Sequence, residues 1–152
     1  MTPREIAAAL DADPIAGLTH GLGYTTRGWS DAVEVEPCLM LTVERADVTI
    51  YLNHDDLSGV FATAGRLKTK EFWVRPETLR ADLVEILAWS LNAVHPDPTA
   101  PETRAALRTP GLYGEVLRRH LTDRRDVLKA LDFPDHRPLV AALTAALKET
   151  ST

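Results

Sequence analysis

The run Asn53-His54-Asp55-Asp56 contains residue types that bind metal ions and perform acid–base catalysis. It follows a predicted strand, and neighbouring side chains of an extended chain point in opposite directions, so this spacing does not favour convergence on one ligand. The other histidines form no recognised ligand spacing with it. We therefore expect a polar loop that caps the following turn, with a metal or catalytic site around His54, Asp55 and Asp56 as the alternative.

Cys38 is the single cysteine, so no intramolecular disulfide can form, which is typical of a reducing compartment. Glu36 is close to it in the sequence, and a carboxylate neighbour raises the pKa of a thiol, so we do not expect a reactive nucleophile. Gly21 and Gly23 lack the third glycine of a dinucleotide-binding loop. Because the common hydrolase, metalloprotease and Walker motifs do not occur either, no cofactor and no resident metal are predicted.

A basic segment in the second half of the chain suggests another kind of chemistry. Residues 104–129 hold seven cationic side chains against three acidic ones, which leaves a local charge of +4. Two short helices meeting near Thr122 resemble a helix-turn-helix in outline, although the usual glycine turn and a base-reading Asn or Gln are missing. We expect solvated arginines whose stems cover apolar surface, with nucleic-acid binding as the alternative function. The candidate contacts are Arg104, Arg108, Arg118, Arg119, Arg124, Arg125 and Lys129.

An acidic surface is predicted in the first half. Residues 33–44 alternate apolar and polar positions, and residues 48–52 continue the pattern after a short turn, which indicates an antiparallel hairpin with one buried face. Pro37 predicts an edge strand or a bulge. The outer face, with Tyr51, is the candidate surface for a basic protein partner. Its acidic candidates are Glu34, Glu36 and Glu44.

The longest apolar stripe lies between Pro76 and His95, with the three- and four-residue spacing of one helix face. It predicts a helix that covers the sheet. Trp89 falls roughly 120° from the centre of this stripe. We expect Trp89 to pack against the C-terminal helices, and an anchor for a partner is the alternative. A strand over residues 68–75 precedes this helix, and Thr2 caps a first helix that ends near Leu10.

Three prolines in residues 96–101 predict a linker between an α+β core over residues 1–95 and a helical subdomain over residues 102–152. The subdomain is predicted to contain helices over residues 102–108, 112–121, 123–131 and 137–149. The fold class is therefore α+β. An N-terminal helix precedes a small antiparallel sheet of three to four strands, which the long helix covers, and a C-terminal helical bundle packs on this core.

The composition is typical of one globular domain. Of 152 residues, 45% are apolar and 26% charged, and no apolar run approaches the ~20 residues of a membrane helix. The first residues show no signal-peptide pattern and arginine outnumbers lysine, so we expect a bacterial cytoplasmic protein. Because catalytic motifs are missing, the predicted function is a non-enzymatic protein-interaction module: an adaptor, chaperone, immunity or assembly factor. It would bind a protein partner or a second copy of itself.

Overall fold

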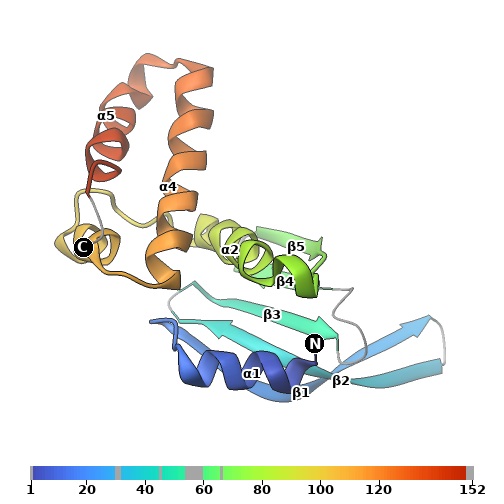
Figure 1. The fold of residues 1–152 in the computed structure, drawn as a ribbon. Helices are drawn as coiled ribbons and strands as arrows, with labels where there is room; N and C mark the ends of the chain where they lie inside the picture. Colours follow the sequence, from blue (N-terminus) through green and yellow to red (C-terminus); the bar gives the residue numbers. More distant parts are fainter. Residues whose placement is uncertain (1, 30–31, 45, 54–59, 66, 150–152) are drawn as a thin grey trace.

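The computed structural model describes residues 2–29, 32–44, 46–53, 60–65 and 67–149. An N-terminal helix is followed by a five-stranded antiparallel sheet and then by helices that pack together (Figure 1). The α+β class is confirmed, whereas the predicted three to four strands are too few, because β4 was not expected. The elements are α1 (Pro3–Ala12), β1 (Leu18–Trp29), β2 (Ala32–Val43), β3 (Val48–Asn53), β4 (Val60–Ala64), β5 (Leu67–Phe72), η1 (Pro76–Thr78), α2 (Leu79–Ser90), η2 (Leu91–Ala93), α3 (Pro101–Arg108), α4 (Leu112–Leu131), η3 (Pro134–His136) and α5 (Arg137–Ala146).

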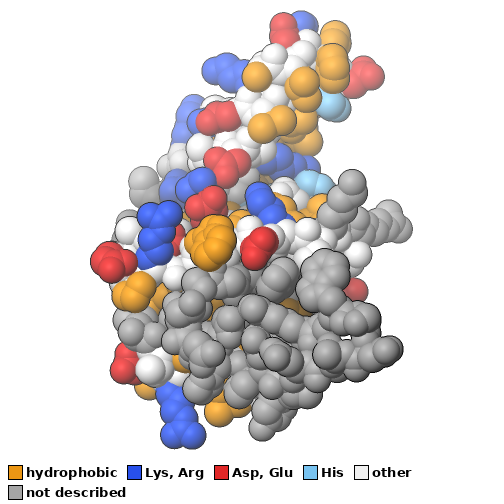
Figure 2. Space-filling model, turned by 90° about the vertical axis from the view of Figure 1, so that its right-hand side faces the viewer, with side chains coloured by type: hydrophobic (Ala, Val, Ile, Leu, Met, Phe, Trp, Pro, Cys, Tyr) orange, Lys and Arg blue, Asp and Glu red, His pale blue; other side chains and the backbone are white. Residues whose placement is uncertain are grey.

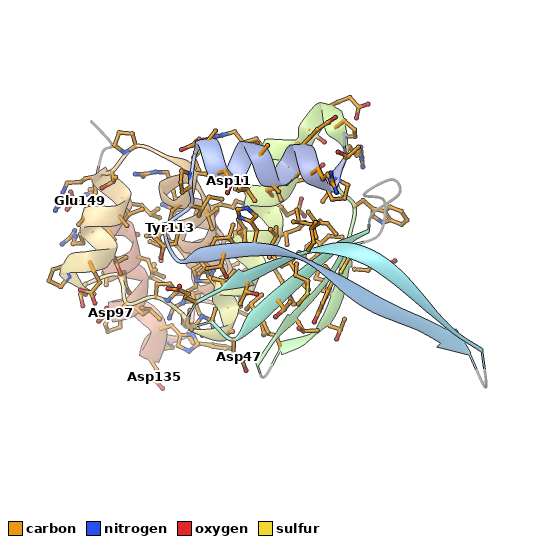
Figure 3. The ribbon with its side chains drawn as sticks, turned by 90° about the horizontal axis from the view of Figure 1, so that it is seen from below. Asp11, Asp47, Asp97, Tyr113, Asp135 and Glu149 are labelled. Atoms are coloured by element: carbon orange, nitrogen blue, oxygen red, sulfur yellow. The ribbon has the colours of Figure 1, made fainter. Side chains whose placement is uncertain are left out.

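The sheet is a meander in which each strand pairs with the next along the chain. β1 and β2 pair over all twelve residues of each strand, whereas β3 covers only residues 38–43 of β2. The far ends of β1 and β2 therefore project beyond the other strands as a two-stranded ribbon (Figure 1 and Figure 3). Pro37 lies in this ribbon, where its missing N–H removes no bond to β3. The predicted edge position is correct for this part of β2, and the unbroken β1–β2 register contains no bulge.

The two faces of the sheet differ in chemistry. One face is apolar and lies beneath α1 and α2, as the period of two predicted. The opposite face carries threonines in register across four strands, because Thr42 lies opposite both Thr19 and Thr49, and Thr49 lies opposite Thr63. The described centre of the outer face is therefore rich in hydroxyl groups. The fully buried members of the inner face include Leu39, Leu41, Val48, Ile50, Leu52 and Ala62.

α1 and α2 form as their sequence signals predict. α1 begins with a capping box, because the Thr2 hydroxyl accepts from the Glu5 N–H and the Glu5 carboxylate accepts from the Thr2 N–H. α2 buries Leu83, Ile86 and Leu87 against the sheet. The predicted helix between residues 76 and 95 is thus confirmed, with single turns η1 and η2 at its two ends.

α4 corrects the prediction for the second half of the chain. The sequence predicts two helices separated near Thr122, but one continuous helix of 20 residues spans the whole segment. Leu121 is fully buried there, and Arg119 pairs with Asp123 across one turn at 2.9 Å. Core packing and an i,i+4 ion pair therefore hold the helix through the predicted break. The predicted pair of helices meeting near Thr122 is therefore wrong.

α3 and α4 approach each other closely at Gly114. A Cβ atom at this position would lie 2.9 Å from the Thr109 carbonyl oxygen and 3.2 Å from that of Ala106. Such separations are too short for a carbon–oxygen contact, so only glycine fits between the two helices without a shift. The first turn of α4 is thereby set directly against the end of α3.

One core joins the sheet to the helical segment. A single cluster of buried apolar side chains extends from Ile6 in α1 to Leu143 in α5. Residues 96–101, which the sequence predicts as a linker, include a compact turn. Its Asp97 carboxylate accepts hydrogen bonds from the backbone N–H and the hydroxyl of Thr99, at 2.9 and 2.7 Å. The helices of the second half therefore share their packing with the sheet.

Candidate functional site

The first half of α4 packs against α2. His120 of α4 is buried, and its Nδ1 lies 3.1 Å from the carbonyl oxygen of Ala88 in α2. Because a carbonyl oxygen only accepts, Nδ1 carries the proton and donates it. Burial lowers the pKa of His120 to about 4, so the ring is neutral at pH 7 and links the two helices without charge.

The second half of α4 extends away from α2, which crosses the first half of the helix (Figure 1). Arg124, Val127 and Leu131 follow His120 by four, seven and eleven residues, so they extend the helix face that meets α2. In this half the apolar members of that face are open to solvent, with Val127 60% and Leu131 50% exposed. A face that belongs to the core in the first half of α4 is therefore surface in the second half.

The turn after α4 adds a third exposed apolar side chain. Asp132 adopts a left-handed backbone conformation with φ 50°, and its N–H donates to the Leu128 carbonyl at 3.2 Å. Phe133 follows and is 52% exposed, with its ring centroid 5.6 Å from that of His136. α4 and α5 form a helical hairpin, and Figure 2 shows apolar side chains gathered around the end where the two helices are joined, near the top of the view. We call Val127, Leu131 and Phe133 the apolar tip.

A hollow of about 440 Å³ adjoins the apolar tip, and its lining comes from the second half of α4, from η3 and α5, and from the segment after α2. Arg124 enters this lining with one guanidinium nitrogen 3.3 Å from the Pro96 carbonyl oxygen, to which it donates. Burial and, to a smaller extent, the positive charge of the nearby Arg124 lower the pKa of His95, so this imidazole is also neutral at pH 7. The lining residues are Asn92, His95, Asp123, Arg124, Val127, Leu128, His136 and Leu139.

Trp89 lies on α2 where this helix meets the last strand of the sheet. Its ring meets Phe72 of β5 edge to face, with centroids 5.5 Å apart and an interplanar angle of 64°. Lys70 Nζ lies 5.0 Å from the Phe72 centroid and 5.9 Å from that of Trp89. The ring of Trp89 therefore contacts β5, and the hollow beside it is also lined by Arg119, His120 and Asp123 of α4, so packing against the C-terminal helices stays a prediction. This smaller hollow of about 250 Å³ between β5, α2 and α4 keeps Trp89 partly exposed.

The arginine-rich segment makes many contacts within the chain. Arg104 Nε and Arg108 Nη1 lie 3.2 and 3.3 Å from oxygens of the Glu149 carboxylate. Arg118 donates to three backbone carbonyls and so ties the end of α3 to the residues that follow α5. Its acceptors are the carbonyl oxygens of Leu107, Leu147 and Glu149, at 3.3, 3.0 and 2.7 Å.

Other cations of this segment lie further along α4. Arg119 pairs with Asp123 at 2.9 Å, and Arg125 pairs with Asp126 at 3.0 Å. Lys129 is exposed in the last turn of the helix. Because the predicted contacts are distributed around α3 and α4 and mostly face acceptors of their own chain, the described residues do not form one open cationic surface.

The predicted acidic surface is described only in part. Glu34 and Glu36 lie on the projecting ribbon, and their side chains fall outside the described residues. Glu44 is exposed just after β2, and Tyr51 is half-buried on β3. Trp89 packs against β5, which β3 and β4 separate from β2. The structure therefore does not bring Glu44 and Trp89 into one surface.

The candidates for catalysis remain without structural support. His54, Asp55 and Asp56 lie outside the described residues, so the alternative site there stays a prediction. Among the residues that the structure describes, no group of His, Cys, Asp and Glu side chains is arranged to hold a metal ion. Cys38 is buried, and burial raises the pKa of its thiol, which is the opposite of what a nucleophile requires.

No family model, curated protein or solved structure matches this chain. In the described part of the chain, every helix is too short or too polar to cross a membrane. The apolar tip and its hollow therefore have to be interpreted from their own geometry and chemistry.

Proposed function

We propose that this chain is a non-enzymatic protein-interaction module, and that the apolar tip with the hollow beside it is its docking surface. One observation carries the proposal. Three large apolar side chains, each at least half exposed, lie within seven residues at the end of a helical hairpin. Single exposed apolar residues need no explanation, but a contiguous group beside a concave surface is typical of a binding site for another protein.

The shape of this surface fits a helical partner. α2 crosses this face of α4 in the first half of the helix, and the face continues beyond the crossing (Figure 1). A partner helix lying along the second half of α4 would cover Val127 and Leu131, and one of its apolar side chains could enter the hollow. This is the helix-in-groove mode of recognition, in which residues at i, i+3, i+4 and i+7 act as anchors.

Nucleic-acid binding receives weaker support. Of the seven predicted contacts, six have guanidinium groups that pair with a carboxylate or donate to a carbonyl of the chain itself. Phosphate binding would have to compete with these partners. If duplex DNA nevertheless bound at about 50 mM salt, with an affinity that fell steeply as salt was added, the nucleic-acid alternative would be preferred.

A photoreactive aromatic residue placed at Leu131 tests the proposal. It should form adducts with protein, either another protein of the source cells or a second copy of the chain, and Val127→Asp should abolish them. The matched control carries the same photoreactive residue in place of Trp73. This position is exposed like Leu131 but lies just after β5. Identical adducts from both positions, or none from Leu131, would overturn the proposed function.

A further inference from the structure

We infer that the partner of the apolar tip is a second copy of this chain, docked about a two-fold axis so that two α4–α5 hairpins form a four-helix bundle. The inference rests on the proposed function, because it names the occupant of the same surface. Four-helix bundles of this kind bury apolar residues on the facing sides of helices that cross at a shallow angle.

The surface offers both halves of a self-complementary contact. In a two-fold interface the same patch faces itself, so each projection needs a recess elsewhere on that patch. Phe133 and Leu131 project at the end of the hairpin, and the hollow with its Leu128 and Leu139 walls lies beside them on the same pair of helices. The projecting side chains of one copy can therefore enter the hollow of the other, and the reverse contact forms at the same time.

The charge of the hairpin also favours a second copy. Residues 123–140 carry four basic and four acidic side chains, so their net charge is zero in a chain of net charge −5. Two such segments can face each other without net repulsion. A strongly acidic or basic partner would find no opposite net charge to recognise, which distinguishes this patch from one built for a charged peptide. The charged residues are Asp123, Arg124, Arg125, Asp126, Lys129, Asp132, Asp135 and Arg137.

Several of these charges are also paired within their own chain. Arg125 lies 3.0 Å from Asp126, and Arg137 lies 3.7 Å from Asp132. Association should therefore depend on apolar burial and respond little to salt, in contrast to an interface made by charge attraction. The free part of the α4 face, from Arg124 to Leu131, spans about two turns, or about 10 Å. This is short for a standard interface, so we expect a dissociation constant in the micromolar range.

Sedimentation velocity over a range of about 1 µM to about 1 mM protein tests the inference. The wild-type chain should pass from monomer to dimer, and its midpoint should move less than threefold between low and high salt. Val127→Asp and Leu131→Asp should each keep the chain monomeric, with melting temperatures that show an intact fold. The matched control is Leu22→Asp, which changes a leucine 64% exposed on β1 and should leave the dimer in place.

Each other outcome overturns the inference. The second copy is excluded if the wild-type chain stays monomeric up to the highest concentration, or if the dimer survives both aspartates. Loss of the dimer in Leu22→Asp alone would place the interface on the sheet edge. The photoreactive residue at Leu131 then distinguishes a failure of the second-copy inference from a failure of the proposed function. Adducts with a different protein would leave the proposed function standing without the second copy, and no adduct together with a monomer would remove both.

Discussion

The two halves of α4 present one continuous helix face to two different environments. In the first half, Val116, Leu117 and Leu121 are almost completely buried against the core. In the second half, Val127 and Leu131 occupy the same face and are at least half exposed. Their side-chain types are alike, so hydrophobicity does not explain the difference. What differs is that α2 crosses only the first half of α4 (Figure 1), so an apolar stripe indicates a face that favours burial but not whether the element that covers it belongs to the same chain.

The largest effect in this comparison is expected for Leu121→Ala. Leu121 is fully buried, and removing most of its side chain should leave a cavity that costs about 2–5 kcal/mol of the free energy of unfolding. Urea unfolding followed by circular dichroism measures this value. If Leu121→Ala and Leu131→Ala destabilised the dilute monomer equally, the distinction between the two halves of α4 would be lost.

The next effect depends on pH and concerns His120, where the first half of α4 meets α2. The folded chain keeps this ring neutral down to about pH 4, whereas an imidazole in the unfolded chain has its ordinary pKa of 6.5. The unfolded state therefore binds more protons between these values. The contribution of His120 to the free energy of unfolding should be fully present above pH 6.5. It should decrease as the pH drops towards 4, by up to about 3 kcal/mol.

His120→Asn provides the matched control for this pH dependence. The amide nitrogen of asparagine is as far from the backbone as Nδ1 and can still donate to the Ala88 carbonyl, but it does not titrate. The difference in stability between wild type and variant, measured between about pH 7 and about pH 4.5, cancels the carboxylates that titrate in the same range. Parallel pH profiles for the two proteins would show that His120 is not held neutral by the fold.

A smaller loss is expected for Arg118→Met, which keeps most of the apolar stem but removes the guanidinium. Three carbonyl oxygens at the ends of α3 and α5 then lose a charged donor, at a cost of about 1.5–3 kcal/mol. Arg119→Met is the control, because Arg119 makes an exposed pair worth less than about 1 kcal/mol. Thermal unfolding of both variants measures the difference, and a larger loss in the control would contradict this assignment.

The smallest effect on stability is expected at the apolar tip itself. Val127→Ala removes a side chain that is 60% exposed and introduces a better helix former, so the stability of the dilute monomer should change by no more than about 0.5 kcal/mol. Self-association should nevertheless weaken. Unfolding at low protein concentration and sedimentation at high concentration measure these two quantities separately. A large loss of stability in the monomer would mean that Val127 belongs to the core.

Regular periodicity explains which elements could be predicted. The alternation over residues 33–52 predicted the β2–β3 hairpin, and the apolar stripe between residues 76 and 95 predicted α2. β1 was harder because Gly21 and Gly23 weaken a strand pattern, and its pairing with β2 is a contact between strands that local propensity does not contain. β4 is short, with small alanines that give little alternation.

The candidate site was missed for a related reason. Thr122 and Asp123 are good capping residues, so the sequence favoured a break where burial of Leu121 and the Arg119–Asp123 pair maintain the helix. With the break removed, the apolar positions run on to Val127 and Leu131 at helical spacing. That continuous stripe was the available signal. Their exposure, however, depends on where α2 crosses α4, which periodicity alone does not reveal.

The close approach at Gly114 fixes the direction in which α4 leaves α3. Leu131 lies 17 residues beyond this contact, or about 26 Å away, so a small tilt at Gly114 produces a larger displacement at Leu131. A methyl group at position 114 would wedge the two helices apart, and a tilt of only about 5° would swing the far end by about 2 Å. Gly114→Ala should therefore displace Val127 and Leu131 without contacting them, so the position of the apolar tip is set at the opposite end of the helix.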